Sequence, residues 1–116
     1  MGVAEDVDMH RFVAWALLAA GCGGPLSEGQ GEFEKGHYAQ AAQSLAAIEA
    51  GSRAWAPAER AEYALYRGLA CGALGDVARA RAWLGRAKAR EDAHPGSLAP
   101  DDARRLRLAI DTYEVR

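Results

Sequence analysis

The chain has 116 residues, 50% of them hydrophobic and 26% charged, which is enough for one domain with a modest core and too little for two. Its 14 basic and 16 acidic residues give a net charge of −2, so no general field draws it to nucleic acid. Its two cysteines, Cys22 and Cys71, form neither a CxxC pair nor a Cys/His spacing, which argues against a disulfide framework and a zinc site.

Residue types that favour helices dominate the chain. Ala, Leu, Arg and Glu are abundant and lose little side-chain freedom in a helix, whereas isoleucine occurs only at positions 48 and 110. The residues that favour strands are correspondingly scarce. The sequence therefore predicts an all-α protein.

An apolar run occupies residues 12–20 and directly follows His10 and Arg11. A membrane-spanning helix needs about 20 apolar residues, so this run is too short to be one, but it has the length of the hydrophobic part of a signal peptide. The next residues, Gly-Cys-Gly-Gly, place small residues on both sides of Cys22. This pattern resembles the signal sequence of bacterial lipoproteins, in which the cysteine is lipidated and becomes the mature N-terminus.

The resemblance implies a signal peptide at residues 1–21, a mature chain at residues 22–116 and a lipid anchor on Cys22. The lipid attachment of such proteins uses several acyl chains, which anchor a protein firmly to a membrane. Gly23 follows the cysteine, where an Asp would direct retention, so the resemblance implies the outer membrane if the source is Gram-negative.

Residues 1–8 are acidic, whereas a signal peptide begins with basic residues. Met9 is therefore an alternative start, because it would place His10 and Arg11 directly before the apolar run. The other interpretation is an apolar helix at residues 8–21 that packs on the rest of a soluble, cytoplasmic protein.

A short helix is predicted to begin near Pro25 and Ser27, since Pro suits a first helical turn and Ser caps one. The turn Gly36-His37 then leads into a stronger helix over residues 38–49. Its apolar residues recur at helical spacing on one face: Tyr38, Ala41, Leu45 and Ile48.

Gly51 is expected to end this helix in the left-handed conformation, and residues 51–57 are expected to form a linker that contains Trp55. A third helix is predicted over residues 58–74. The residues expected on its buried face are Leu65, Gly68, Leu69 and Gly72.

The pair Gly75-Asp76 is expected to turn the chain back into a fourth helix over residues 77–90, and a last helix is predicted over residues 101–113, after a loop rich in turn formers. Inward-facing residues of these two helices are expected to be Val77, Ala80, Leu84, Ala87, Ala103, Leu106, Ala109 and Ile110.

The two halves of the helical region repeat at a spacing of 39 residues. At this spacing Gly29, Gly36, Tyr38, Ala41, Leu45 and Ile48 align with Gly68, Gly75, Val77, Ala80, Leu84 and Ala87. The pattern resembles the tetratricopeptide repeat (TPR), a helix–turn–helix unit of about 34 residues with small residues where the helices approach closely.

The resemblance implies antiparallel helix hairpins stacked as a short TPR-like solenoid. Two units are fewer than the roughly three that such arrays need, so the last helix is expected to act as a cap. A homodimer would be another way of covering the open end. The residues expected to carry the repeat packing are Gly36, Tyr38, Ala41, Leu45, Gly68, Gly75, Ala80, Leu84 and Ala87.

No pattern in the sequence predicts a catalytic, cofactor or metal site. The three histidines, His10, His37 and His94, are scattered and have no second ligand at helical spacing. The few Ser and Thr hydroxyls lie in no activating motif. We therefore expect a protein without enzymatic activity, cofactor or bound metal.

Residues 79–107 carry a local excess of basic side chains. Trp83 is the only aromatic residue between Arg79 and Arg90, so nucleic-acid binding, which uses interleaved aromatic rings, is not expected. We predict instead an adaptor that binds a partner protein, tethered to an envelope membrane or, alternatively, soluble in the cytoplasm. The residues predicted to contact the partner are Tyr63, Tyr66, Arg67, Arg79 and Arg81.

Overall fold

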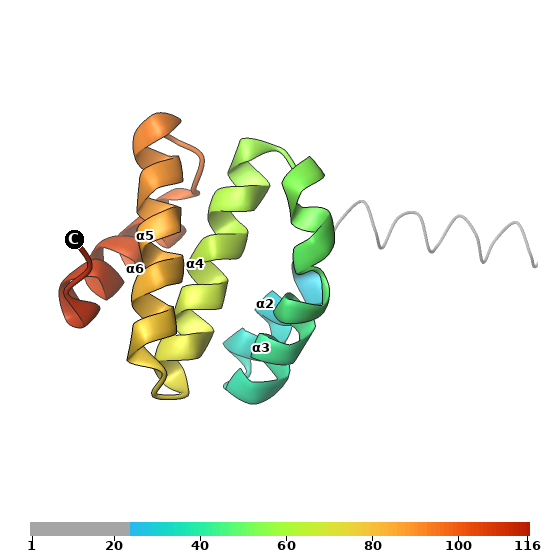
Figure 1. Cartoon of the computed structure of the whole chain (residues 1–116). Helices are drawn as coiled ribbons and strands as arrows, with labels where there is room; N and C mark the ends of the chain where they lie inside the picture. The colour runs from blue at the N-terminus through green and yellow to red at the C-terminus, as the bar shows by residue number, and fades with distance from the viewer. Residues whose placement is uncertain (1–23) are drawn as a thin grey trace, which may run out of the picture.

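The computed structural model describes residues 24–116 as a set of packed helices (Figure 1). Within this range there is no β-strand, which confirms the predicted all-α class. The elements are α2 (Ser27–Glu34), α3 (Tyr38–Ala47), the 3-10 helix η1 (Glu49–Ala54), α4 (Pro57–Ala73), α5 (Val77–Ala93) and α6 (Pro100–Tyr113). None of these helices is both long and apolar enough to cross a membrane. The signal peptide, the Met9 start and the lipidated Cys22 concern residues outside the described range.

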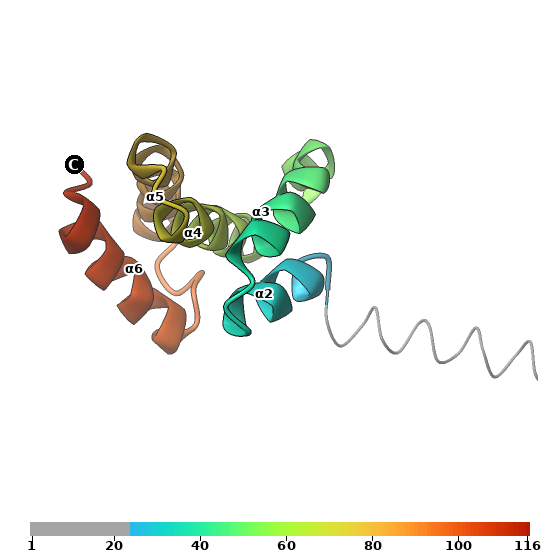
Figure 2. The same ribbon diagram turned by 90° about the horizontal axis from the view of Figure 1, so that it is seen from below.

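Helix α4 lies at the centre and contacts α2, α3, α5 and α6. Figures 1 and 2 show α3 and α5 on opposite sides of α4, while α2 and α6 lie toward a second face of the molecule. The most extensive contact joins α4 to α5, and α2 packs against α3. Each of these two pairs is an antiparallel hairpin, because a tight turn connects its helices.

Both hairpin turns depend on a glycine in the left-handed region. Gly36 has φ of +82° and Gly75 has φ of +86°, a conformation that residues with a Cβ adopt only at a cost. After the second turn, the Asp76 carboxylate accepts a hydrogen bond of 3.2 Å from the backbone N–H of Arg79 and so caps the first turn of α5. The turns predicted at both places are therefore present.

Each of the two hairpins contains the same kind of close contact between its own helices. A Cβ placed on Gly68 of α4 would lie 2.6 Å from Cγ of Leu84 in α5, and a Cβ on Gly29 of α2 would lie 2.6 Å from Cγ of Leu45 in α3. Both leucines are fully buried. The 39-residue spacing of the sequence thus corresponds to an equivalent glycine-to-leucine contact in each hairpin. The small residues Ala41, Ala80 and Ala87 are also fully buried.

Three local predictions are wrong. Gly51 does not end α3 in the left-handed conformation; it lies within η1, where successive bonds from residue i+3 to residue i tighten the chain. Residues 51–57 are consequently not an open linker. Tyr38 and Val77 are 37% and 39% exposed rather than buried, because each is the first residue of its helix, beside the turn at the end of the hairpin.

Helix α6 is attached through an apolar contact and a polar network. Leu106 is buried against the core. Arg105 donates hydrogen bonds to Glu34 (Nη1 to Oε1, 2.7 Å) and to the Tyr66 hydroxyl (3.0 Å). The hydrogen bond from Arg105 holds the pKa of the Glu34 carboxyl below its usual value. This network links α6 to α2 and α4 on the face away from α3 and α5.

Candidate functional site: a basic groove between α3 and α5

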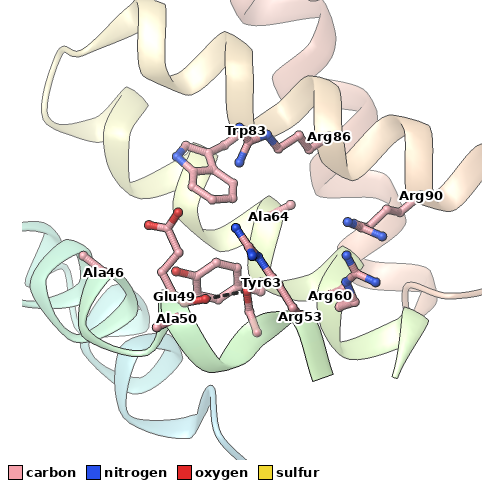
Figure 3. Close-up of a pocket in the computed structure, with 11 residues that line it drawn as sticks. Ala46, Glu49, Ala50, Arg53, Arg60, Tyr63, Ala64, Trp83, Arg86 and Arg90 are labelled. Carbon is pink, nitrogen blue, oxygen red and sulfur yellow. Dashed lines mark hydrogen bonds between the residues drawn. The ribbon is translucent and has the colours of Figure 1, made fainter. Parts of the chain in front are cut away.

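A groove of about 730 Å³ lies between the end of α3 with η1 on one side and α5 on the other, and the N-terminal half of α4 forms its floor (Figure 3). Helices α3 and α5 flank α4 without extensive contact between them, which leaves this face open. The lining residues are Ala46, Glu49, Ala50, Ser52, Arg53, Arg60, Tyr63, Ala64, Trp83, Arg86 and Arg90.

The floor of the groove is built around Tyr63, which is 2% exposed. Its ring meets Trp55 and Trp83 edge-on, with centroids 5.3 Å and 5.6 Å away. Its hydroxyl donates a hydrogen bond of 2.6 Å to the carbonyl oxygen of Leu45. Burial raises the pKa of the Tyr63 hydroxyl, so the side chain stays neutral and keeps its proton for this bond. Tyr63 thereby connects α4 to α3.

The Arg67 side chain is fixed by contacts within the protein. Its guanidinium lies 4.6 Å from the centroid of the Trp83 ring, and Nη1 donates to the Tyr63 hydroxyl at 2.9 Å. The same nitrogen is 3.1 Å from Oε1 of Glu49. Glu49, the acidic residue in the lining, therefore neutralises Arg67 and holds η1 against α4.

The four arginines of the lining have no such partner within residues 24–116. Arg53, Arg60, Arg86 and Arg90 form no salt bridge with an acidic residue of the described range. Burial, followed by the charges of Arg60 and Arg86, lowers the pKa of Arg90, which means that these guanidinium groups are close enough to repel one another. Figure 3 shows the guanidinium groups of Arg60 and Arg90 close to each other.

Arg86 is held in place by an aromatic ring. Its guanidinium lies 4.4 Å from the centroid of Trp83, in addition to that of Arg67. A guanidinium on a ring face keeps its N–H groups at its edge, where they remain able to bind a carboxylate or phosphate in a two-pronged geometry. The groove thus presents positioned donors as well as charge.

The charge in the groove is local. The described range contains 13 of the 14 basic residues, all but Arg11, and all of the acidic residues except Glu5, Asp6 and Asp8, so its formal net charge is zero. A neutral body with four unneutralised cations in one groove will attract an anion to that place. No cluster of three or more metal-ligating side chains occurs in residues 24–116.

Two of the residues predicted to contact a partner are buried in the structure. Tyr63 and Tyr66 are 2% and 5% exposed, so they belong to the core and cannot offer an exposed contact surface. Their position follows from α4 being covered on several sides by other helices. Arg67 is not among the lining residues and is engaged instead with Tyr63, Glu49 and Trp83.

Arg79 and Arg81 lie outside the groove. Arg79 is highly exposed and is 3.5 Å from Asp76, while Arg81 donates to the carbonyl oxygen of Tyr113 at 2.6 Å. The groove instead takes Arg86 and Arg90 from the same helix. Their separation of four residues places them on one face of a helix, but Arg79, seven residues before Arg86, shares that face, so spacing alone separates only Arg81 from them.

The described range is all-helical and has a basic surface groove with aromatic residues at its floor. No protein-family model, curated protein or solved structure matches the chain. The function of the groove therefore has to be inferred from its own chemistry.

Proposed function

We propose that the protein is a non-catalytic adaptor that binds a partner protein in the groove between α3 and α5. The observation that carries this proposal is the convergence, over an aromatic floor, of four arginines that have no acidic partner within the described range. Arginine and aromatic residues are the side chains that most often carry the energy of protein interfaces. The hydroxyl of Ser52, which lies in the lining, donates to the carbonyl oxygen of Glu49, so it is engaged in structure.

We further propose that the hairpins form a short TPR-like solenoid in which α6 acts as the C-terminal cap. The equivalent contacts of Gly29 with Leu45 and of Gly68 with Leu84 support this proposal. So do the starts of α4 and α6, where Pro57 and Pro100 each follow an extended alanine. In such an array the inward-facing residues are shared between neighbouring units.

A photo-crosslinking experiment tests the binding proposal. A photoreactive amino acid at Ala50, which is exposed and lines the groove, is expected to give an adduct with the partner in extract of the native cells. The same amino acid at Ala82, an exposed position of α5 outside the lining, is the matched control and is expected to give none. The double variant Arg86→Glu/Arg90→Glu should abolish the adduct from position 50, as seen in gels and by mass spectrometry.

Equal adducts from both positions, or an adduct that survives the double variant, would show that the groove is not the binding site. An adduct of twice the chain mass would instead identify a second copy of this protein as the partner. Circular dichroism of the variants establishes that their helices are intact.

For location, we propose that the protein is tethered to a bacterial envelope membrane through lipidated Cys22. The support is the sequence pattern of small residues around this cysteine after a short apolar run. The Cys22→Ala variant is expected to move from the membrane fraction to the soluble fraction, and mass spectrometry of the natural protein should find an acylated N-terminal cysteine. Unchanged partitioning of the variant would favour the alternative, a soluble cytoplasmic adaptor with an apolar N-terminal helix.

A further inference from the structure

The groove contains more basic side chains than acidic side chains that could neutralise them. The lining contains four arginines, and none of them forms a salt bridge with an acidic residue of the described range, because Glu49, the acidic residue of the lining, is paired with Arg67. Burial, and after it the positive charges of Arg60 and Arg86, lower the pKa of Arg90, and the repulsion among these three side chains opposes the folded state. An anion in the groove would remove this repulsion and would be bound more tightly for that reason.

The positions of the arginines define the shape of this anion. Arg53 comes from η1, Arg60 from α4, and Arg86 and Arg90 from α5, so the charges surround the groove from three elements. One small ion could reach only part of this set. A groove of about 730 Å³ is also larger than a single inorganic ion requires. The ligand is therefore a chain that carries several negative charges.

The aromatic residues argue against a nucleic acid as this chain. Single-stranded nucleic acids bind by stacking their bases on open aromatic faces. Two guanidinium groups, those of Arg67 and Arg86, already lie on the ring of Trp83, and the ring of Tyr63 is buried. The described range as a whole is neutral, and outside the groove lining its acidic residues outnumber its basic ones, so there is no excess of positive charge there to bind a longer polyanion.

Building on the proposed function, we infer that the groove binds a short acidic segment of the partner protein. At least two Glu or Asp carboxylates of that segment accept hydrogen bonds from guanidinium groups on opposite walls, Arg53 on one side and Arg86 or Arg90 on the other. The apolar side chains between the carboxylates contact Trp83, which lines the groove. The bound segment neutralises the four arginines, which have no acidic partner in residues 24–116.

Titration calorimetry with the full-length protein tests this inference. The probe is a blocked synthetic peptide of alternating Glu and Leu, and the comparison peptide has Gln in place of Glu. We expect the acidic peptide to bind, its affinity to fall as salt is added, and the Gln peptide to bind at least about tenfold more weakly. A single-stranded oligonucleotide of similar charge and inorganic phosphate are expected to bind more weakly than the acidic peptide.

Variants locate the binding to the groove. Arg86→Glu/Arg90→Glu, and the milder Arg86→Ala/Arg90→Ala, should each reduce the affinity for the acidic peptide by about tenfold or more. Arg79→Glu/Arg81→Glu makes the same charge change on the same helix outside the groove and should leave the affinity within about twofold, since exposed charges at a distance act weakly.

Each outcome distinguishes this inference from the proposed function. Equal binding of the Gln peptide, stronger binding of the oligonucleotide or phosphate, or equal losses in the groove and control variants would overturn the acidic-segment inference. If the acidic peptide does not bind but position 50 still crosslinks to a partner protein, the inference fails and the adaptor function stands. If position 50 also gives no adduct, both fail.

Discussion

Replacing Gly68 by alanine is expected to lower the free energy of unfolding by about 1–3 kcal/mol. The added Cβ would lie 2.6 Å from Cγ of Leu84 and 3.2 Å from its backbone nitrogen. Leu84 is fully buried, so it has no free space into which it could move. Helices α4 and α5 would have to separate, and this is the most extensive helix contact of the molecule. Urea unfolding followed by circular dichroism measures the change.

The matched control is Gly31→Ala in α2. A Cβ at Gly31 would have nothing within 4 Å, and the residue lies inside a helix, where alanine is favoured over glycine by roughly 0.5–1 kcal/mol. We therefore expect a small gain in stability. If Gly68→Ala behaved like Gly31→Ala, the close glycine-to-leucine contact between the hairpin helices would not exist.

A double-mutant cycle identifies the clashing partner. Leu84→Ala alone is expected to cost about 2–5 kcal/mol, because it leaves a cavity in the core. In the Leu84→Ala background, Gly68→Ala should cost much less than it does alone, since the side chain that it would meet has been removed. Purely additive effects would assign the cost of Gly68→Ala to something other than Leu84.

Tyr63→Phe is expected to lower the free energy of unfolding by about 1–3 kcal/mol, which is large for the removal of a single oxygen atom. The buried Tyr63 hydroxyl donates to the carbonyl oxygen of Leu45 at 2.6 Å and accepts from Nη1 of Arg67 at 2.9 Å. Without it, the Leu45 carbonyl keeps only the long hydrogen bond of 3.3 Å from the Ile48 N–H, and Arg67 keeps only Glu49 as a hydrogen-bond partner. The contact between α3 and α4 depends on this bond, so the variant should also weaken binding in the groove.

The control for this change is Tyr38→Phe. Tyr38 is 37% exposed and contacts Phe33 through its ring, with centroids 5.2 Å apart. We expect its effect to stay within about 0.5 kcal/mol, as is usual for surface positions. Thermal melts of the two variants in parallel make the comparison, and similar losses in both would show that the Tyr63 hydroxyl has no special role.

The hairpin of α4 and α5 was the part of the fold that could be predicted best. Its helices need only local signals: apolar residues at helical spacing, a glycine that adopts positive φ at position 75, and Asp76 as the cap. Gly51 was less predictable, because a glycine after a helix is usual both for a left-handed ending and for a tightened 3-10 turn. The choice of η1 depended on how the end of α3 meets α4.

The candidate site could be predicted only in part. Helical spacing places Arg86 and Arg90 on one face of α5, but it places Arg79 on the same face and separates only Arg81 from them. Tyr63 and Tyr66 were placed on an exposed face because interfaces are rich in such residues, whereas α4 is covered by helices on several sides and buries both. A central helix cannot be recognised from its own sequence, since its burial is a property of its neighbours.

By itself, the sequence determined the helical class, the two glycine turns and the equivalence of Gly29 and Gly68, because propensity, positive φ and residue size are local properties of the chain. Only the tertiary structure decided that Arg53 and Arg60 share a groove with Arg86 and Arg90. These residues come from three elements, and the distance between those elements is set by how closely the helices pack. The groove exists because α3 and α5 pack on opposite sides of α4, and no local signal in the chain specifies that arrangement.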